Sequence, residues 1–145
     1  MDKFIEVRNI MTSDLITADP DEVLDSVKHK LISNHIQHIP VVDGKKILGI
    51  ISKGDIHRME HHFTLFQSEK ALESNRQIFS TILASEIMTK TLVKLKDTDT
   101  ASIAVDLFKE NLFHALPVVN AKDQLVGMIT PIDLLRYAFD DVKAL

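Results

Sequence analysis

The sequence predicts an α/β fold, of the kind also described as α+β, in which two tandem strand–helix–strand–strand–helix repeats pack about a pseudo-two-fold axis. The main observation is self-similarity: Ile10-Met11-Thr12 recurs as Ile87-Met88-Thr89, and Pro40-Val41-Val42 recurs as Pro117-Val118-Val119, both 77 residues later. The second observation is size, because the 145 residues make about one ordinary domain. A repeat of roughly 55 residues buries too little core to stand alone, so we expect the two copies to pack together.

The first helix of each repeat has recognisable start and stop signals. Asp19 is the expected N-cap, with Pro20 at the first helical position and Glu22 completing a capping box. Apolar residues then follow at helical spacing. Asn34 and Asn111 stand where the two helices are expected to stop, because asparagine tolerates the left-handed conformation of a C-terminal cap.

Short apolar runs mark the strands. They are expected at residues 15–17, 39–42 and 47–52 in the first repeat and at residues 91–95, 116–119 and 124–130 in the second. Asp43-Gly44 is a strong signal for a hairpin turn between the last two strands of the first repeat, and residues 120–123 form the corresponding turn. A final helix is expected after Ser52 and after Thr130.

The repeats set the expected domain boundaries. We place the first repeat at residues 1–59, a partly helical linker at 60–84 and the second repeat at 85–145. The linker is too apolar for a flexible tether, so we expect it to pack on the core, or alternatively on a partner chain. Its apolar residues are Phe63, Leu65, Phe66, Leu72, Ile78, Phe79, Ile82 and Leu83.

Composition excludes several classes of protein. The formal net charge is −4, which disfavours a nucleic-acid binder because phosphate contacts need clustered Lys and Arg. The chain has no Cys, so no disulfide, thiol nucleophile or Cys-based metal site is possible. The N-terminal residues lack the apolar run of a signal peptide, and no stretch is long and apolar enough to span a membrane. We therefore expect a cytoplasmic protein.

The junction between the last strand and the last helix is the candidate binding site of each repeat. Ser52 and Asp55 stand there in the first copy, and Thr130 and Asp133 match them 78 residues later, after one inserted residue. A helix N-terminus suits a phosphate, and a hydroxyl beside it can donate a further hydrogen bond. A carboxylate three residues on can accept from a vicinal diol such as that of ribose. The alternative is that these residues only cap their helices.

Together these motifs resemble the CBS domain, named after cystathionine beta-synthase. The pattern is Met-Thr, strand, helix, Pro-Val-Val, then Gly-x-x-Ser/Thr-x-x-Asp, and both copies carry it. The chain is similar to free-standing prokaryotic CBS pairs of the acetoin-utilisation type. The resemblance implies a regulatory module that binds an adenosine-containing ligand, such as AMP, ADP, ATP, S-adenosylmethionine or a NAD-type molecule. It also implies a homodimer of pairs and a separate, unidentified regulated protein.

The resemblance assigns residues to this ligand residue by residue. It implies that Asp55 and Asp133 hold ribose, that Ser52 and Thr130 approach phosphate, and that each cleft combines elements of both repeats, with Asp133 facing the strand of Thr17. Close backbone approach is expected at Gly49 and Gly127. The implied adenine slot uses Leu15, Ile16, Thr17, His38, Ile39, Pro40, Leu92, Val93, Ala115, Leu116 and Pro117. Lys53 can reach a phosphate where the second copy has Pro131, so the two clefts should differ in phosphate preference.

Other readings of the sequence are weaker. His57 and His61 have the helical spacing of metal ligands, and His62 adjoins them, but no third ligand is fixed by spacing, so no metal site is predicted. Arg58 and Arg136 are expected at the surface. No catalytic motif is present, which leaves an unrecognised ATP hydrolase as a remote reading. The main alternative to ligand sensing is a structural, oligomerisation or protein-interaction module with vestigial, unoccupied clefts.

Overall fold

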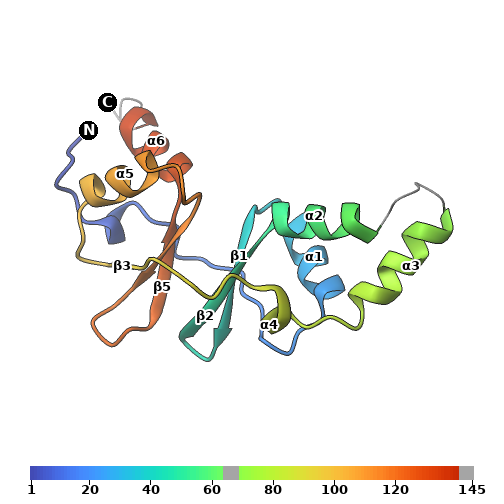
Figure 1. Cartoon of the computed structure of the whole chain (residues 1–145). Coiled ribbons are helices and arrows are strands. Elements are labelled where there is room, and N and C mark those ends of the chain that lie inside the picture. Colours follow the sequence, from blue (N-terminus) through green and yellow to red (C-terminus); the bar gives the residue numbers. More distant parts are fainter. Residues whose placement is uncertain (64–68, 141–145) are drawn as a thin grey trace. The chain divides into compact units, whose positions relative to one another are not determined.

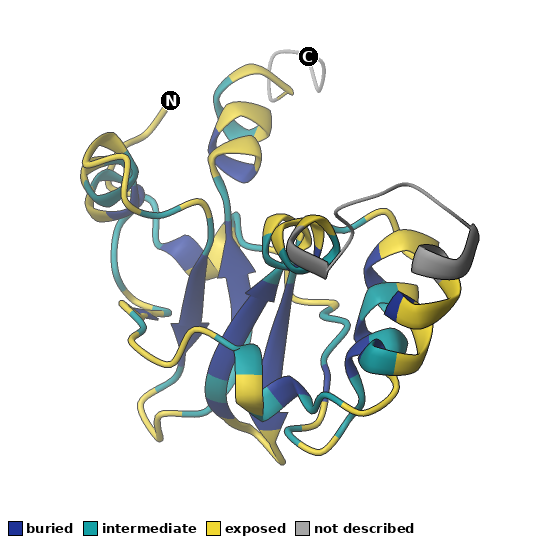
Figure 2. Cartoon of the chain, turned by 45° about the vertical axis from the view of Figure 1, so that its right-hand side comes forward, coloured by how far each residue is buried: buried dark blue, intermediate teal, exposed yellow. Residues whose placement is uncertain are grey.

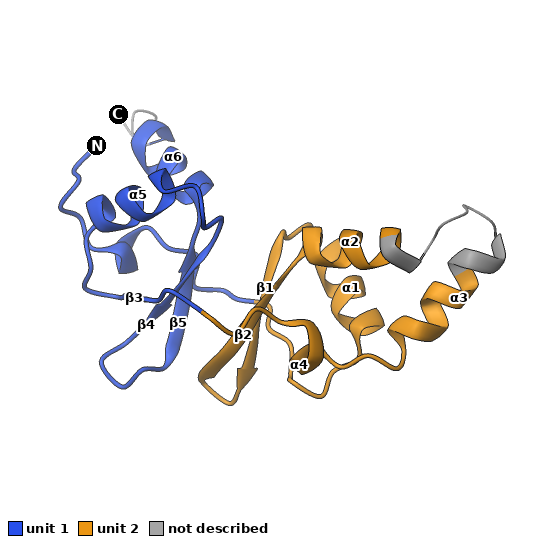
Figure 3. Ribbon diagram, in the orientation of Figure 1, with its two compact units in different colours: residues 1–15, 92–145 blue, residues 16–91 orange. Residues whose placement is uncertain are grey.

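The computed structural model describes residues 1–63 and 69–140, with the side chains of residues 62–72 left out of the description. The chain divides into two compact units (Figure 3). Unit 1 is made of Met1–Leu15 together with Leu92–Leu145, and unit 2 is Ile16–Thr91. Each unit is therefore a mixture of residues from both halves of the sequence.

Unit 2 is built on an antiparallel hairpin, with helices on its flank (Figure 1). Its elements are α1 (Leu24–Ser33), β1 (His38–Asp43), β2 (Lys46–Ser52), α2 (Lys53–Phe63), α3 (Glu69–Phe79) and α4 (Ala84–Ile87). Ile39 lies opposite Ile51 in the hairpin, and a β-bulge falls between Val41 and Val42. Gly44 occupies the turn with a φ of 61°, as the Asp-Gly signal predicts.

Unit 1 repeats this plan with a three-stranded sheet. Its elements are η1 (Val7–Asn9), β3 (Leu95–Lys96), α5 (Ala101–Lys109), β4 (Leu116–Val119), β5 (Leu125–Ile129) and α6 (Pro131–Asp140). The strand order is β3-β4-β5, with β3 parallel to β4 and β5 antiparallel to it. The helices α2 and α6 begin directly after Ser52 and Thr130, which confirms their predicted starts.

Each unit has its own apolar core, and the strands are its most uniformly buried elements (Figure 2). In unit 2 the fully buried Leu24, Leu31 and Ile39 belong to one core cluster with Phe79 of α3. The partly buried Ile78 and Ile82 pack against this cluster. In unit 1 the core joins β4 and β5 to α5, with Val7 of the N-terminal segment buried among them. The side chains of Phe63, Leu65, Phe66 and Leu72 lie outside the described part of the chain.

A short segment at the start of each repeat packs on the sheet formed by the other repeat. In unit 1, Thr12 forms an antiparallel bridge with Met128 of β5. In unit 2, Thr89 forms the matching bridge with Ile50 of β2. Met11 and Met88 stand just before these bridges, and each lies against a glycine of the strand. A Cβ on Gly49 would come within 2.6 Å of Met88 Cγ, and one on Gly127 would overlap the sulfur of Met11.

The predicted start of the first helix is wrong. The helix begins at Leu24, and Val23 before it is extended, because its backbone forms an antiparallel bridge with Leu83. The Asp19-Pro20 signal instead closes a turn, in which the Glu22 amide donates to the Asp19 carbonyl at 3.1 Å.

Two smaller expectations also need correction. At the end of α1 the left-handed residue is His35, with a φ of 53°, whereas Asn34 has a φ of −101° and caps with its side chain. Asn111 is left-handed as predicted. No strand forms at residues 15–17; the next residue, Ala18, forms a single parallel bridge with Val41. The strand expected at 91–95 is shorter and later in the chain, as β3.

Candidate functional site

In unit 2 the predicted hydroxyl–carboxylate pair lies at the junction of β2 and α2. The Ser52 amide donates to Asp55 Oδ2 at 2.8 Å, and the Asp55 amide donates to Ser52 Oγ at 3.0 Å. This reciprocal pair has the geometry of a capping box. Arg58, one turn further along α2, forms an ion pair with Asp55 Oδ1. The Arg58 side chain is largely exposed, as the sequence predicts.

In unit 1 the equivalent pair at the junction of β5 and α6 is arranged differently. The Thr130 amide donates to Asp133 Oδ2 at 2.8 Å, and the Thr130 hydroxyl donates to the same oxygen at 3.1 Å. The other oxygen, Oδ1, accepts from the Thr12 hydroxyl at 3.1 Å. Asp133 is only 8% exposed, so its carboxylate is held on both sides by hydroxyl and amide donors.

The capping role therefore exists in both copies, and it leaves room for a ligand. A carboxylate offers about four acceptor positions. Among the bonds of the described residues, Asp55 uses one position for an amide and one for Arg58. Asp133 uses three positions, two of them on Oδ2. Ser52 Oγ acts as an acceptor, so its own proton can still be donated to a phosphate.

A recess opens beside Asp55. It has a volume of about 400 Å³ and is lined by Asp55, Arg58, Met59 and Ile87. Lys53 and Pro131, the first residues of α2 and α6, are exposed. The first pair thus has Lys53 at its helix start and Arg58 one turn further on, and the corresponding positions of α6 are occupied by Pro131 and Arg136.

The residues expected to form the adenine slot divide between the two units. Unit 2 holds Ile16, Thr17, His38, Ile39 and Pro40, whereas Leu92, Val93, Ala115, Leu116 and Pro117 belong to unit 1 and Leu15 ends its N-terminal segment. His38 lies opposite Ser52 in the hairpin register, so this one residue of the expected slot adjoins the junction of β2 and α2. Ile39 and Leu116 are fully buried core residues, so neither presents its side chain to a ligand in this structure. That Asp133 faces Thr17 stays a prediction.

Gly49 and Gly127 are explained in this structure by the methionines that lie against them. Both glycines are buried in strands, and the space of the absent side chain is taken by Met88 and Met11, respectively. Sequence reasoning assigned both positions to close backbone approach, and the approaching group in this structure is a methionine side chain.

Thr12 is a residue of the candidate site that sequence reasoning missed. It belongs to the repeated Met-Thr pair, but the repeat does not indicate that this threonine meets Asp133, 121 residues away. Thr12 and its counterpart Thr89 are both exposed, but no hydrogen bond from the Thr89 hydroxyl to Asp55 is found among the described residues.

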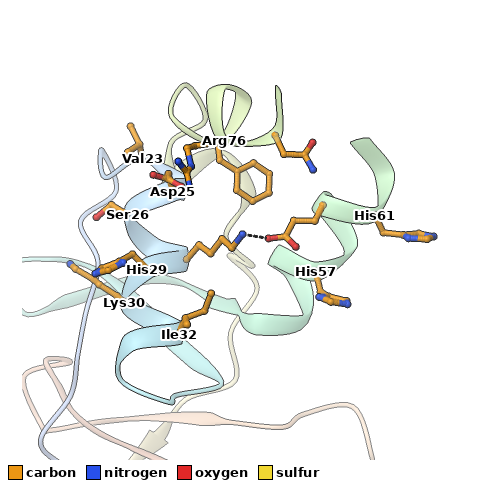
Figure 4. A pocket seen from close by; sticks show the side chains of 13 residues that line it. Val23, Asp25, Ser26, His29, Lys30, Ile32, His57, His61 and Arg76 are labelled. Atoms are coloured by element: carbon orange, nitrogen blue, oxygen red, sulfur yellow. Dashed lines mark ion pairs between the residues drawn. The ribbon is translucent and has the colours of Figure 1, made fainter. Parts of the chain in front are cut away.

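A second recess of unit 2 lies elsewhere, among α1, α2 and α3 (Figure 4). It has a volume of about 1180 Å³ and none of the predicted ligand residues line it. Across it Lys28 Nζ forms an ion pair with Glu60 Oε1 at 2.6 Å, and Lys28 also lies 5.9 Å from the centre of the Phe79 ring. His57 and His61 line this recess, and no group of three potential metal ligands occurs within the described residues.

Glu22 is the one described group with a clear shift of its acidity. Burial raises the pKa of Glu22, and hydrogen bonds from Lys30 and Ser26, both at 2.8 Å, lower it. The lowering is the larger effect, so the pKa of Glu22 lies below its ordinary value. Lys30 also donates to the Thr17 carbonyl at 3.0 Å. Through this lysine, Glu22 fixes the segment that the sequence assigns to the adenine slot.

Comparison with known proteins gives a consistent result. The family model described as the CBS domain matches residues 7–62 and 84–140. The uncharacterized protein MJ1225 of Methanocaldococcus jannaschii is 27% identical over 131 residues, which cover 90% of this chain and 46% of that protein. The chain thus spans about half the length, or less, of the first curated relatives that it matches.

Two solved structures share the whole fold. The acetoin utilization protein AcuB from Vibrio cholerae has a TM-score of 0.77 at 26% identity, covering 97% of this chain and 94% of that one. The CBS domain pair of protein MJ0100, solved in complex with 5'-methylthioadenosine and S-adenosyl-L-methionine, has a TM-score of 0.71 at 26% identity, covering 95% and 98%. Among the described helices, none has the length and apolar character of a membrane span.

Proposed function

The chain belongs to the CBS domain family, and from this premise we propose that it is a regulatory module that binds an adenosine-containing ligand at its two hydroxyl–carboxylate pairs. The observation that carries the proposal is the duplicated pair Ser52–Asp55 and Thr130–Asp133. In both copies the amide of the hydroxyl residue donates to the carboxylate three residues later, where a strand ends and a helix begins. Binding rather than catalysis fits this geometry, because each carboxylate is held in place by hydrogen-bond donors.

Each part of the ligand has a matching group. The amides of Gly54 and Ile132, at the second positions of α2 and α6, have no partner within their helices and suit a phosphate, and the proton of Ser52 Oγ can be donated to a phosphate at the start of α2. The Lys53 amide instead donates to the Gln37 carbonyl at 2.8 Å, and Pro131 has no amide proton. The carboxylate three residues later accepts from the ribose hydroxyls. The recess beside Asp55 falls within the size range of small-molecule sites, about 300–1000 Å³. The adenosine moiety shared by the two ligands of the MJ0100 pair supports this class of ligand.

The two pairs are expected to prefer different ligands. Lys53 and Arg58 place two cations near the first pair, which favours ADP or ATP with their additional phosphate charges. Pro131 removes one of these cations from the second pair, which favours AMP or S-adenosylmethionine. Ligand binding then regulates a separate protein by stabilising one arrangement of the module over another.

A homodimer is the expected assembly. Ile132, Leu135 and Phe139 of α6 are each more than half exposed, and they recur along one face of the helix. A stripe of exposed apolar residues marks an interaction surface, and a second copy of the chain would cover it about a two-fold axis.

The same stripe favours a second candidate function, that of an interaction module with unoccupied ligand sites. In that case the hydroxyl–carboxylate pairs serve as helix caps only, and oligomerisation or partner binding does not depend on nucleotides. The two functions are separated by whether the purified protein responds to any adenosine ligand.

The test is isothermal titration and thermal unfolding with AMP, ADP, ATP and S-adenosylmethionine, with and without Mg²⁺. A ligand at 100 times its dissociation constant stabilises the folded state by about 2.7 kcal/mol. We expect Asp55→Asn and Asp133→Asn to remove binding at one site each, while Asp106→Asn, which alters an exposed carboxylate on α5, binds as the wild type does. Unchanged binding in both site variants would refute the proposed residues.

Two controls complete this test. Unfolding of each variant without ligand shows that the loss of binding is not a loss of fold. Acid release followed by adenine absorbance shows whether the sites are already filled by a co-purified nucleotide. If no ligand binds and no nucleotide is released, the interaction-module function is favoured.

A further inference from the structure

The two ligand sites differ in how their carboxylates are held. Asp55 Oδ1 is held by Arg58, a residue of the same helix. Asp133 Oδ1 is held by Thr12, which reaches it from the N-terminal segment of unit 1. Thr12 is therefore in direct contact with the group that the proposed function assigns to ribose.

We propose that Thr12 and the ribose diol compete for Asp133, so that ligand binding at the second site releases the Thr12 hydroxyl and loosens the Met11–Thr12 part of the N-terminal segment. This inference rests on the proposed function and adds a regulatory device to it. The site senses its ligand, and the released segment is the part of the chain that responds.

The competition follows from the number of acceptor positions on Asp133. Oδ2 already accepts two hydrogen bonds, from the amide and the hydroxyl of Thr130. Oδ1 accepts one from Thr12, which leaves one of its two lone pairs. A diol brings two donors, so its second hydroxyl needs a position that is already in use. Both bonds to Oδ2 come from Thr130, the residue that directly precedes α6, whereas the bond to Oδ1 comes from Thr12, which lies outside the helix. The Thr12 bond is therefore the one that yields without disturbing the start of α6.

The neighbouring contacts limit the release to a short stretch. The Thr12 amide donates to the Met128 carbonyl at 2.9 Å, and the Met128 amide donates to the Thr12 carbonyl at 2.9 Å. Met11 fills the space beside Gly127. Upstream of it, the fully buried Val7 is held by its amide bond to the Asp99 carbonyl at 2.7 Å. The response is therefore expected at the Thr12–Met128 bridge and not along the whole segment.

The first repeat supplies a matched internal control. Thr89 and Ile50 form the same backbone bridge, with distances of 2.9 and 3.1 Å. Since Arg58 holds Asp55 Oδ1, a ligand at the first site has no threonine hydroxyl to displace. The Thr89–Ile50 bridge should be insensitive to ligands.

The experiment measures amide hydrogen exchange and AMP affinity in an Asp55→Asn background, in which only the second site binds, and exchange at the Thr89–Ile50 bridge in an Asp133→Asn background, in which only the first site binds. We expect AMP to speed exchange of the Thr12 and Met128 amides but not of the Thr89 and Ile50 amides. A 2'-deoxy-AMP probe, with one ribose hydroxyl, should bind without this effect because a single donor fits the remaining lone pair. Thr12→Val, which removes the donor at constant shape, should bind AMP about two- to tenfold more tightly. Thr12→Ser, which keeps the hydroxyl, should match the background protein.

The possible outcomes are distinct. Equal or weaker AMP binding by Thr12→Val, or slower exchange at Thr12 when AMP binds, would overturn the competition and leave the proposed function intact. Absence of binding by any adenosine probe, with no nucleotide released from the wild type by acid, would overturn the proposed function and this inference with it. The exchange measurement needs no change at Thr12, so it decides the matter even if a Thr12 variant folds poorly.

Discussion

Replacing Gly127 by alanine tests the packing between the N-terminal segment and β5. The added Cβ would overlap the sulfur of Met11 and lie 2.8 Å from its Cγ and 2.9 Å from its Cε. Carbon atoms in favourable contact are about 3.5–4.0 Å apart, so several atoms of Met11 must move together. Met11 must therefore leave its position, because no rotation of its last bond alone relieves the overlap at Cγ.

The cost is that of overpacking a filled site, about 1–3 kcal/mol. For a chain of this size the loss lowers the melting temperature by about 3–10 °C. Denaturant unfolding of the purified protein measures the free energy directly. Gly54→Ala is the control, because its Cβ would meet nothing closer than 3.5 Å. At this helical position alanine should stabilise the protein by about 0.5–1 kcal/mol.

A double-mutant cycle identifies the contact responsible. If Met11 is the obstacle, Met11→Ala should relieve the strain, and the double variant should be at least about 1 kcal/mol more stable than the sum of the two single losses predicts. Additive losses, within about 0.5 kcal/mol, would refute the reasoning. A Gly127→Ala protein as stable as the wild type would do the same.

Three further predictions follow from other features. The pKa of Glu22 is lowered in the folded state, so this carboxylate stabilises the fold at pH values above its ordinary pKa of 4.5. That stabilisation is lost as the pH falls through the pKa of the folded state. Glu22→Gln should therefore flatten the pH dependence of the free energy of unfolding in this range, and an unchanged slope would contradict the assignment. Phe79→Ala should cost about 3–5 kcal/mol in denaturant unfolding, because Phe79 is 2% exposed, and a loss below about 1 kcal/mol would show that α3 does not hold the core. Leu135→Ser combined with Phe139→Ser should shift the protein to a monomer in sedimentation analysis, whereas a dimer that persists would place the interface elsewhere.

Most local elements could be predicted from the sequence because their signals are local. The Asp43-Gly44 turn and the helices that start after Ser52 and Thr130 depend on residues that adjoin them in the chain. The start of α1 could not be read in this way. Val23 is kept extended by a bridge to Leu83, and a capping signal at Asp19 does not reveal a partner that far along the chain.

The candidate site likewise combines local motifs, which the sequence predicts, with distant contacts, which it does not. The hydroxyl–carboxylate pairs are local motifs, and the structure forms both of them as hydrogen-bonded pairs. The partner of Asp133 is Thr12, which the repeat offset cannot identify, because an offset shows which residues are alike and not which copy a segment packs against. The differing partners of the two carboxylates, Arg58 and Thr12, arise from tertiary contacts that sequence similarity between the repeats conceals.

The order in which the units are completed during synthesis follows from the composition of unit 1. Unit 2 is a continuous stretch, Ile16–Thr91, and all of its strands and helices are made before β4 and β5. Met1–Leu15 emerges first but belongs to a unit that closes last, since Thr12 meets a residue 121 positions later. Contacts of such long sequence separation slow folding. Val7 and its neighbours are therefore expected to stay without their unit 1 partners while unit 2 folds, and a nascent chain stalled once residue 91 has left the ribosome should show a protected unit 2 and a protease-sensitive N-terminus.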